Sequence, residues 1–204
     1  MTQAKERPIL FSAPMVRAIL SGQKTVTRRE VKKPAALDCL AAGFEPAFLA
    51  LPGNADLCPY GKVGDRLWVR EAWQADEQVN AIAPRELSHG EPIQYPADGA
   101  SRQTGCSMIT PGKTRPSIHM PRWVSRILLE ITDVRVERLQ AISRSHIRAE
   151  GLECPPELAS DDVSPNYRDW YPAAWRDLWE SINGAGAWDA NPWVWVVEFK
   201  RMTN

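Results

Sequence analysis

The chain has 204 residues, of which 44% are hydrophobic and 25% are charged. This length and composition predict one soluble globular domain and exclude a largely disordered chain, and no apolar run is long enough to cross a bilayer. Lys plus Arg and Asp plus Glu both total 25, so the net charge is zero, which argues against a protein that coats long nucleic acid.

The charge is nevertheless unevenly distributed along the chain. Residues 1–35 hold eight Lys or Arg against two Glu, whereas residues 150–190 hold nine Asp or Glu against two Arg. The basic first segment is compatible with a local anionic or nucleotide-like ligand. The polar start MTQAKERP lacks the apolar region of a secretory signal, so we expect a cytoplasmic protein without membrane contact.

The predicted elements begin with a short helix at residues 13–21, which Gly22 is suited to end. The β-branched run that follows predicts a strand. Alternation along that strand separates two sets of side chains: Thr25, Thr27 and Arg29 on one face, and Val26 and Arg28 on the other.

The middle of the chain predicts a strand at Leu67-Trp68-Val69 between two segments rich in turn residues, 34–63 and 74–118. The second segment contains PIQYPADG, which favours one short hairpin. Residues 125–139 alternate over their second half and predict either one long strand or two strands joined by a bend near Thr132-Asp133.

The last third predicts two helices and a strand. Ser143 and Gly151 are suited to begin and end a short helix. Residues 167–182 place a core-facing stripe at helical spacing: Tyr171, Trp175, Leu178, Trp179 and Ile182. A terminal strand follows in NPWVWVVEFK. The sum is an α+β fold, which we expect to be a small mixed β-barrel with short helices at its rim.

The cysteines and histidines do not have the spacing of metal ligands. We interpret the cysteines as ordinary thiols of a reducing compartment: Cys39, Cys58, Cys106 and Cys154. No two histidines among His89, His119 and His146 form a ligand pair. We therefore expect neither a metal nor another cofactor.

Two motifs carry a resemblance to a known family. The first, GQKTVTRR, has Gly22, Lys24, Thr27 and Arg29 in the pattern G-x-K-x-x-T-x-R; the second has Gly64, Asp65, Leu67 and Val69 in the pattern G-D-x-L-x-V. With the order of the predicted elements, these motifs resemble the ASCH domain of the PUA-like barrel superfamily. The chain is most similar to the longer ASCH-like proteins of phages and prophages. The resemblance implies one domain over 1–204, with insertions at about 34–63 and 74–118.

The resemblance also implies a chemistry. Some bacterial ASCH proteins are amidohydrolases that remove the acyl group of N4-acetylcytidine with a lysine, a threonine and a glutamate, which match Lys24, Thr27 and Glu150 here. A hydroxyl attacks an amide when a base takes its proton, and desolvation or a nearby cation lets a lysine be that base. Arg28 and Arg29 are close enough in sequence to supply such a cation, and we expect both to contact the substrate. A carboxylic acid can then protonate the departing amine.

Each of these residues also has a purely structural interpretation. Lysines and arginines on a strand commonly form a solvated face, and Glu150 stands among several acids near a helix end. In the segment IHMPRW, His119, Arg122 and Trp123 precede the long strand, where a ring and a cation are suited to contact a nucleobase. Trp123 is equally suited to fill the interior of the fold.

Three functions remain open. The first is an amidohydrolase acting on an acylated cytosine nucleoside or a similar modified base. The second is a binding module for a nucleoside, a nucleotide or a short single-stranded nucleic acid, without catalysis. The third is a ribonuclease. The sequence predicts no protein partner.

Overall fold

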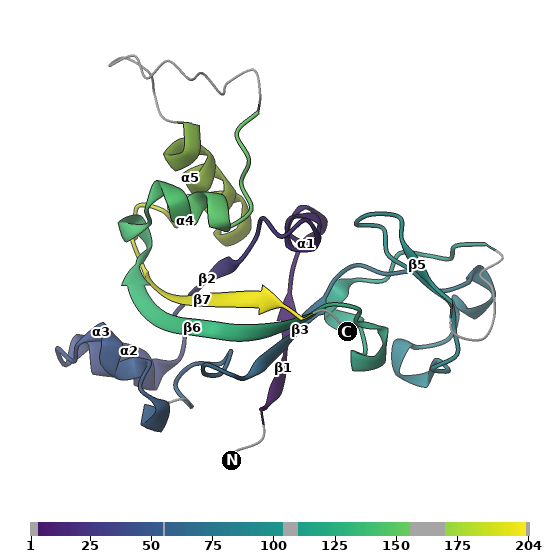
Figure 1. Cartoon of the computed structure of the whole chain (residues 1–204), viewed down its shortest axis with the longest axis horizontal. Helices are drawn as coiled ribbons and strands as arrows, with labels where there is room; N and C mark the ends of the chain where they lie inside the picture. Colours follow the sequence, from purple (N-terminus) through teal and green to yellow (C-terminus); the bar gives the residue numbers. More distant parts are fainter. Residues whose placement is uncertain (1–3, 55, 104–109, 156–169, 203–204) are drawn as a thin grey trace. The chain divides into compact units, whose positions relative to one another are not determined.

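The computed structural model describes residues 4–54, 56–103, 110–155 and 170–202 (Figure 1). These residues form a mixed α+β fold with a main sheet and a few helices, as predicted. The chain divides into two compact units. The first comprises Met1–Gly22, Gly64–Ile131 and Lys200–Asn204, and the second comprises Gln23–Val63 and Thr132–Phe199.

The main sheet has the strand order β1-β3-β6-β7-β2. Strand β6 (Leu128–Arg138) is one continuous strand, so the second of the two predicted alternatives is wrong. No pairing of β1 (Glu6–Leu10) with β2 (Val26–Glu30) occurs among the described residues. The predicted closed barrel is therefore not confirmed and stays a prediction, as does the division into one domain with two insertions.

In the first unit, β1 pairs in parallel with β3 (Arg66–Arg70), and β3 pairs antiparallel with the start of β6. The sequence predicts β3 but not β1, because β1 contains Pro8, which cannot donate to a strand ladder. The structure resolves this conflict by placing β1 at the end of the strand order, where a proline is tolerated. Helix α1 (Ala13–Leu20) follows as predicted, and Gly22 adopts a φ of 81° just after it.

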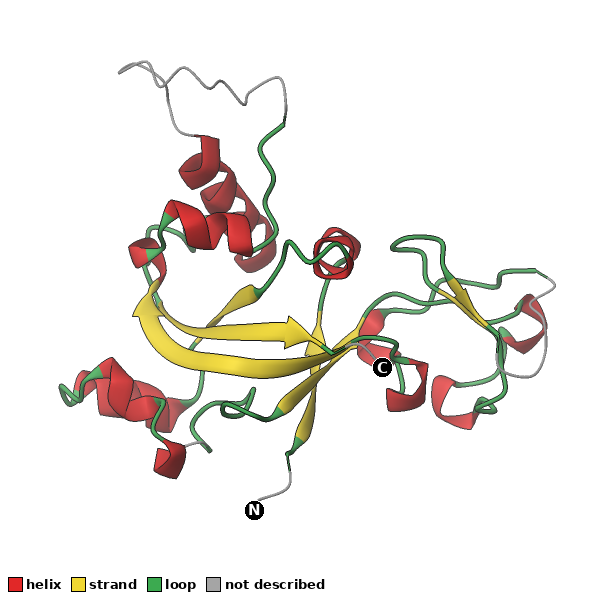
Figure 2. Cartoon of the chain, in the orientation of Figure 1, coloured by secondary structure: helices red, strands yellow, loops and turns green. Residues whose placement is uncertain are grey.

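The long segment between β3 and β6 is mostly loop, drawn green in Figure 2. Its expected hairpin is present, since β4 (Ile93–Gln94) pairs antiparallel with β5 (Ser101–Arg102). A buried cluster holds the segment together: Trp73, Ala75, Leu87, Ile93, Tyr95, Met120 and Val124. The Tyr95 hydroxyl donates to the Val124 carbonyl at 2.7 Å. The segment thus has its own small apolar core.

The second unit contains β2, paired antiparallel with β7 (Trp193–Arg201), and four helices among its described residues. Helices α4 (Arg144–Ala149) and α5 (Trp170–Asn183) are close to their predicted bounds. Helices α2 (Pro34–Ala41) and α3 (Pro46–Leu49) are not predicted by the sequence analysis. Each of them begins with a proline, which is favourable in a first helical turn. The surrounding segment is rich in turn residues, however, so its composition as a whole indicates a loop.

The core of the second unit lies between α5 and the sheet. Its buried members are Val26, Leu139, Ile147, Tyr171, Trp175, Trp179, Val194 and Val196. The predicted stripe of α5 is confirmed for its three large aromatic residues but is wrong for Ile182, whose side chain is exposed. Ile182 lies in the last turn of α5, beyond the reach of the core.

Short 3-10 helices complete the description; they lie at Pro52–Asn54, Glu77–Val79, Pro84–Glu86, Ser117–His119, Arg122–Val124 and Leu139–Ala141. Among the helices described, none combines the length and the apolar composition that a bilayer-spanning segment requires. Cys39, Cys58 and Cys154 are not joined in disulfides, whereas Cys106 lies outside the described residues.

Candidate functional site

The segment that carries Lys24 is fixed by hydrogen bonds before β2 begins. Thr25 donates its backbone N–H to the carbonyl of Ala149 at 2.9 Å, and its own carbonyl accepts from Phe199 at 2.8 Å. These bonds hold the entrance of β2 beside the C-terminal end of α4 and beside β7. Lys24 is thereby placed next to Glu150, the residue at which α4 ends.

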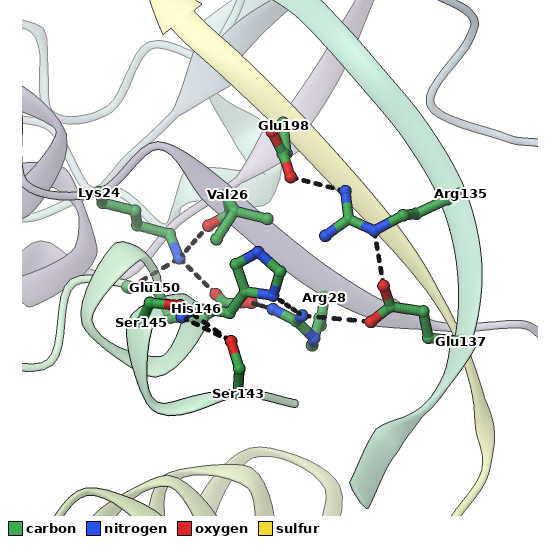
Figure 3. A network of polar contacts seen from close by, with 10 residues as sticks. All are labelled: Lys24, Val26, Arg28, Arg135, Glu137, Ser143, Ser145, His146, Glu150 and Glu198. Carbon is green, nitrogen blue, oxygen red and sulfur yellow. Dashed lines mark hydrogen bonds and ion pairs between the residues drawn. The ribbon is translucent and has the colours of Figure 1, made fainter. Parts of the chain in front are cut away.

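The ammonium group of Lys24 is completely buried and lies among three acceptors (Figure 3). Its Nζ contacts the carbonyl of Val26 at 2.9 Å, the carbonyl of Glu150 at 2.8 Å and Oε2 of Glu150 at 2.7 Å. The exposed fraction of the Lys24 side chain is 0%, and that of Glu150 is 3%. The interpretation of Lys24 as part of a solvated face is therefore wrong.

Glu150 is held at this position by the way α4 is capped. The side chain of Ser143 accepts from the N–H of His146 at the first turn, as predicted. At the other end the Glu150 N–H donates to the His146 carbonyl at 2.9 Å, and Gly151 continues with a φ of 93°. This geometry turns the Glu150 side chain inward, so the interpretation of Glu150 as a solvent-facing residue is also wrong.

A second cation shares the Glu150 carboxylate. Arg28 donates from Nη1 to Oε1 of Glu150 at 3.2 Å and from Nη2 to Oε2 of Glu137 at 3.3 Å. Its side chain has an exposed fraction of 0%. Nη2 also lies 3.3 Å from Nδ1 of His146, which must be unprotonated at that nitrogen to accept this bond. Arg28 is thus committed to internal partners.

The network continues along β6. Oε1 of Glu137 accepts from Nε of Arg135 at 2.6 Å, and Arg135 also donates to Glu198 (Figure 3). A further hydrogen bond from Arg135 reaches Asp133. Burial favours the neutral form of Glu137, but the hydrogen bond and charge of Arg135, with a smaller effect from Arg28, hold its pKa below its usual value. Glu137 therefore stays a carboxylate that holds Arg28 in place.

Burial lowers the pKa of Lys24 from its usual value of 10.5. The Glu150 carboxylate opposes this effect, while the positive charges of Arg29 and Arg28 add to it. Because desolvation penalises the charged form of an amine, it favours the neutral form that a general base requires. Desolvation and a nearby cation are the two conditions under which a lysine is expected to serve as a base, and both are present at Lys24.

The three contacts of Lys24 define where its proton can move. Two of its acceptors are backbone carbonyls, which must receive N–H bonds. The third contact, at 2.7 Å to Oε2 of Glu150, is satisfied both by an ammonium beside a carboxylate and by an amine beside a carboxylic acid. A single proton can therefore transfer between Lys24 and Glu150 along this contact while the bonds to the two carbonyls are kept.

Thr27 and Arg29 lie on the other face of β2. Thr27 pairs with Val197 and Arg28 with Val196, and strand alternation directs the side chains of neighbouring residues to opposite faces. Thr27 is buried, with an exposed fraction of 2%. The structure thus brings Lys24, Arg28 and Glu150 together, whereas the role of Thr27 as a nucleophile stays a prediction.

Arg29 acts by its charge on two titratable side chains. It contributes to the lowered pKa of Lys24, and it also opposes the effect of burial, which raises the pKa of Tyr60. Arg29 is partly buried. Its expected contact with a ligand stays a prediction.

The other predicted binding residues belong to the first unit. His119 is exposed, and Arg122 donates from Nε to Oε2 of Glu6 at 2.9 Å. The ring of Trp123 stacks on that of His89, with 5.0 Å between the centroids, and packs against the cluster around Trp73. Trp123 therefore contributes to the local core and keeps one polar aromatic neighbour.

Sequence reasoning missed the second carboxylate and the histidine of the site. Glu137 lies in a strand whose alternation is visible in the sequence, but nothing there indicates that it reaches Arg28. The spacing of His146 in the sequence excludes a metal-ligand pair but does not indicate a contact with Arg28. Among the described residues, no group of three or more His, Cys, Asp or Glu is arranged to hold a metal ion.

Comparisons with known proteins give one distant structural likeness. No family model matches the chain, and no curated protein matches it. Among solved structures, the chain is similar to a crystal structure of an ASCH domain from Lactobacillus crispatus JV V101. The match has 12% sequence identity and a TM-score of 0.41, and it covers 97% of this chain and 79% of that one. At this distance nothing about the chemistry of the site follows from it.

Proposed function

We propose that this protein is an amidohydrolase that removes the acyl group from an N4-acylated cytosine nucleoside or a similar modified base. The observation that carries the proposal is the buried contact of 2.7 Å between Nζ of Lys24 and Oε2 of Glu150. It joins an amine with a lowered pKa to a carboxyl group, and such a pair supplies both a general base and a general acid for amide hydrolysis. The PUA-like barrel and the single domain over 1–204 are part of the same proposal.

In the proposed reaction Thr27 is the nucleophile, and its side chain, which lies on the face of β2 opposite Arg28, meets Lys24 only when the segment before β2 opens. The shared proton first passes from the Lys24 ammonium to Glu150, and the neutral amine then takes the proton of the Thr27 hydroxyl, whose oxygen bonds to the acyl carbon. Glu150 gives its proton to the nitrogen of the cytosine base as the C–N bond breaks, which restores the ion pair of Lys24 and Glu150. Water hydrolyses the resulting ester, which releases the carboxylic acid and restores Thr27. The net change is amide plus water to amine plus acid.

Arg28 is a positioning residue in this proposal. It holds Oε1 of Glu150, and it is itself held by Glu137 and His146. Because this leaves only Oε2 facing Lys24, the carboxyl group has one orientation for receiving and returning the proton. Since the side chain of Lys24 is fully buried, the acyl group reaches it only when the segment before β2 opens locally.

The test is turnover of N4-acetylcytidine by the purified full chain, followed as cytidine and acetate by chromatography. We expect Lys24→Met, Thr27→Val and Glu150→Gln each to lower kcat by at least about 100-fold. Lys32→Met is the matched control, because Lys32 lies in the same unit with 76% of its side chain exposed. Thr27→Ser should retain measurable turnover, since it keeps the hydroxyl.

Absence of turnover on a series of N4-acylated cytidines would overturn the enzyme proposal. Binding of those nucleosides without turnover would instead favour the alternative, a binding module that uses the same cluster for recognition. Thr27→Val with full activity would remove Thr27 from the mechanism and require a water molecule as the nucleophile. Circular dichroism of each variant distinguishes loss of chemistry from loss of fold.

A further inference from the structure

A hollow in the first unit has a volume of about 460 Å³ and a strongly basic lining. Four of its lining residues are arginines, and none of its described lining residues is acidic: Arg102, Arg122, Arg126 and Arg201. None of them belongs to the network of Lys24. The remaining lining is mostly apolar and includes Leu20, Ile127, Leu128 and Met202.

Two of the four arginines have carboxylate partners. Arg126 donates to both oxygens of Glu71, at 2.9 and 3.0 Å, and to both oxygens of Asp98, each at 2.9 Å. Its guanidinium also lies over the ring of Tyr95, 4.0 Å from the centroid. Arg122 pairs with Glu6. These contacts hold the two side chains in place and balance their charge.

The other two arginines donate to backbone carbonyls, which carry no negative charge. Arg102 donates from Nη1 to the carbonyl of Trp123 at 2.7 Å, and Arg201 donates from Nη1 to the carbonyl of Leu20 at 3.1 Å. Neither forms an ion pair with any residue that the structure describes. The buried Nε of Arg102 also has no hydrogen-bond partner there. The hollow therefore has two guanidinium charges available for an anion.

We propose that this hollow binds the phosphate monoester group of a small ligand of the nucleoside monophosphate class. A guanidinium offers a planar pair of N–H donors that matches two phosphate oxygens, and two such groups match the charge of a phosphate dianion. The volume exceeds that of a phosphate alone, and the apolar part of the lining is suited to contact a base and sugar. This inference does not depend on the proposed amidohydrolase activity.

Isothermal titration of the full chain with cytidine 5′-monophosphate, cytidine and inorganic phosphate tests the proposal. We expect the monophosphate to bind at least about tenfold more tightly than cytidine, because charge-assisted hydrogen bonds contribute that much or more. Inorganic phosphate should bind at the same site but more weakly, since it lacks the apolar body. Equal affinity for the nucleoside and its monophosphate, or no binding of either, would overturn the proposal.

The source of the phosphate is distinguished by a second pair of probes. A short oligoribonucleotide with a 5′-phosphate and the same strand with a 5′-hydroxyl are titrated under identical conditions. Tighter binding of the phosphorylated strand than of the free monophosphate identifies an RNA end as the ligand, and the reverse identifies a free nucleotide. Either result supports the site only if the strand with the 5′-hydroxyl binds more weakly.

Substitution of the arginines that line the hollow tests whether the monophosphate binds there. We expect Arg201→Gln and Arg102→Gln each to raise the Kd for the monophosphate about tenfold. Arg85→Gln is the matched control in the same unit, because 85% of its side chain is exposed, and it should leave the Kd unchanged. Arg201 is itself exposed, so its variant is expected to fold even where Arg102→Gln does not.

Lys24→Met separates this inference from the proposed enzyme. It should abolish deacylation while leaving the Kd for the monophosphate unchanged. If Lys24→Met abolishes phosphate binding and Arg201→Gln does not, the ligand occupies the Lys24 cluster and the hollow is not the site.

Discussion

The carboxylate of Glu150 accepts a hydrogen bond of 2.7 Å from the ammonium of Lys24, although 126 positions separate the two residues in the chain. The same carboxylate also contacts Arg28 through its other oxygen. Two buried cations thus share one carboxylate, and Arg28 has Glu137 as a second partner. This shared contact links the stability of the second unit to the chemistry proposed for it.

Replacement of the shared carboxylate should destabilise the protein strongly. We expect Glu150→Gln to lower the free energy of unfolding by about 3 kcal/mol, because it leaves a buried ammonium without its counter-ion. The double variant Lys24→Met/Glu150→Gln should recover part of this loss. Urea denaturation measures both values.

The control for this prediction is Glu153→Gln, three residues away and exposed. It should change the free energy of unfolding by less than about 0.5 kcal/mol. A Glu150→Gln variant as stable as this control would mean that the Lys24 amine is neutral and needs no carboxylate.

The lowered pKa of Lys24 predicts how stability depends on pH. The unfolded chain holds this proton up to a pKa of about 10.5, whereas the folded protein releases it at lower pH because of burial. Between these two values the unfolded state binds more protons, so stability rises with pH. Below the folded pKa the cost of burying the ammonium is present in full.

The measurement is the urea midpoint of the wild-type protein and of Lys24→Met at several pH values between neutrality and 10.5. We expect the wild-type protein to gain stability relative to the variant as the pH rises through this window. A constant difference between the two proteins would show that the pKa of Lys24 is not lowered by folding.

Two apolar residues of α5 should respond very differently to truncation. Trp175 is buried in the core of the second unit, whereas 54% of Ile182 is exposed. We expect Trp175→Ala to lower the free energy of unfolding by about 3 to 5 kcal/mol and Ile182→Ala to change it by less than about 0.5 kcal/mol. Thermal and urea unfolding measure the free energy of unfolding of both variants. Equal decreases in the two variants would show that the assignment of Trp175 to the core is wrong.

Gly22 of the GQKTVTRR motif is expected to serve conformation and not chemistry. It adopts a φ of 81°, and a Cβ added there would meet no atom within 4 Å. Gly22→Ala should therefore lower the free energy of unfolding by about 1 kcal/mol through backbone strain alone, and Gly22→Asn by less. Turnover per folded molecule should be unchanged in both variants; a large loss in Gly22→Asn would instead indicate contact with the substrate.

Elements with strong local signals could be predicted from the sequence. Helix α1 has apolar residues at helical spacing followed by a glycine, and α4 has a capping serine and a glycine at its two ends. The hairpin of β4 and β5 surrounds a turn-forming run. In each case the residues that decide the conformation are neighbours in the chain.

Elements with conflicting local signals could not be predicted in this way. The proline in β1 argues against a strand, and only the pairing with β3 at the end of the strand order explains it. The prolines of α2 and α3 suggested a loop. The exposure of Ile182 depends on where the core ends, which the helical period alone does not reveal.

The candidate site shows the same division. The sequence by itself determined the residue types and their local settings. They are a lysine two positions beyond a helix-ending glycine, an arginine on the same strand face as Val26, and a glutamate at the end of a capped helix. Only the tertiary structure decided that Lys24, Arg28, Glu137, His146 and Glu150 form one buried network. Their burial and mutual distances arise from the packing of β2, β6 and α4, and the free energy of charged groups depends on those distances and on the exclusion of water.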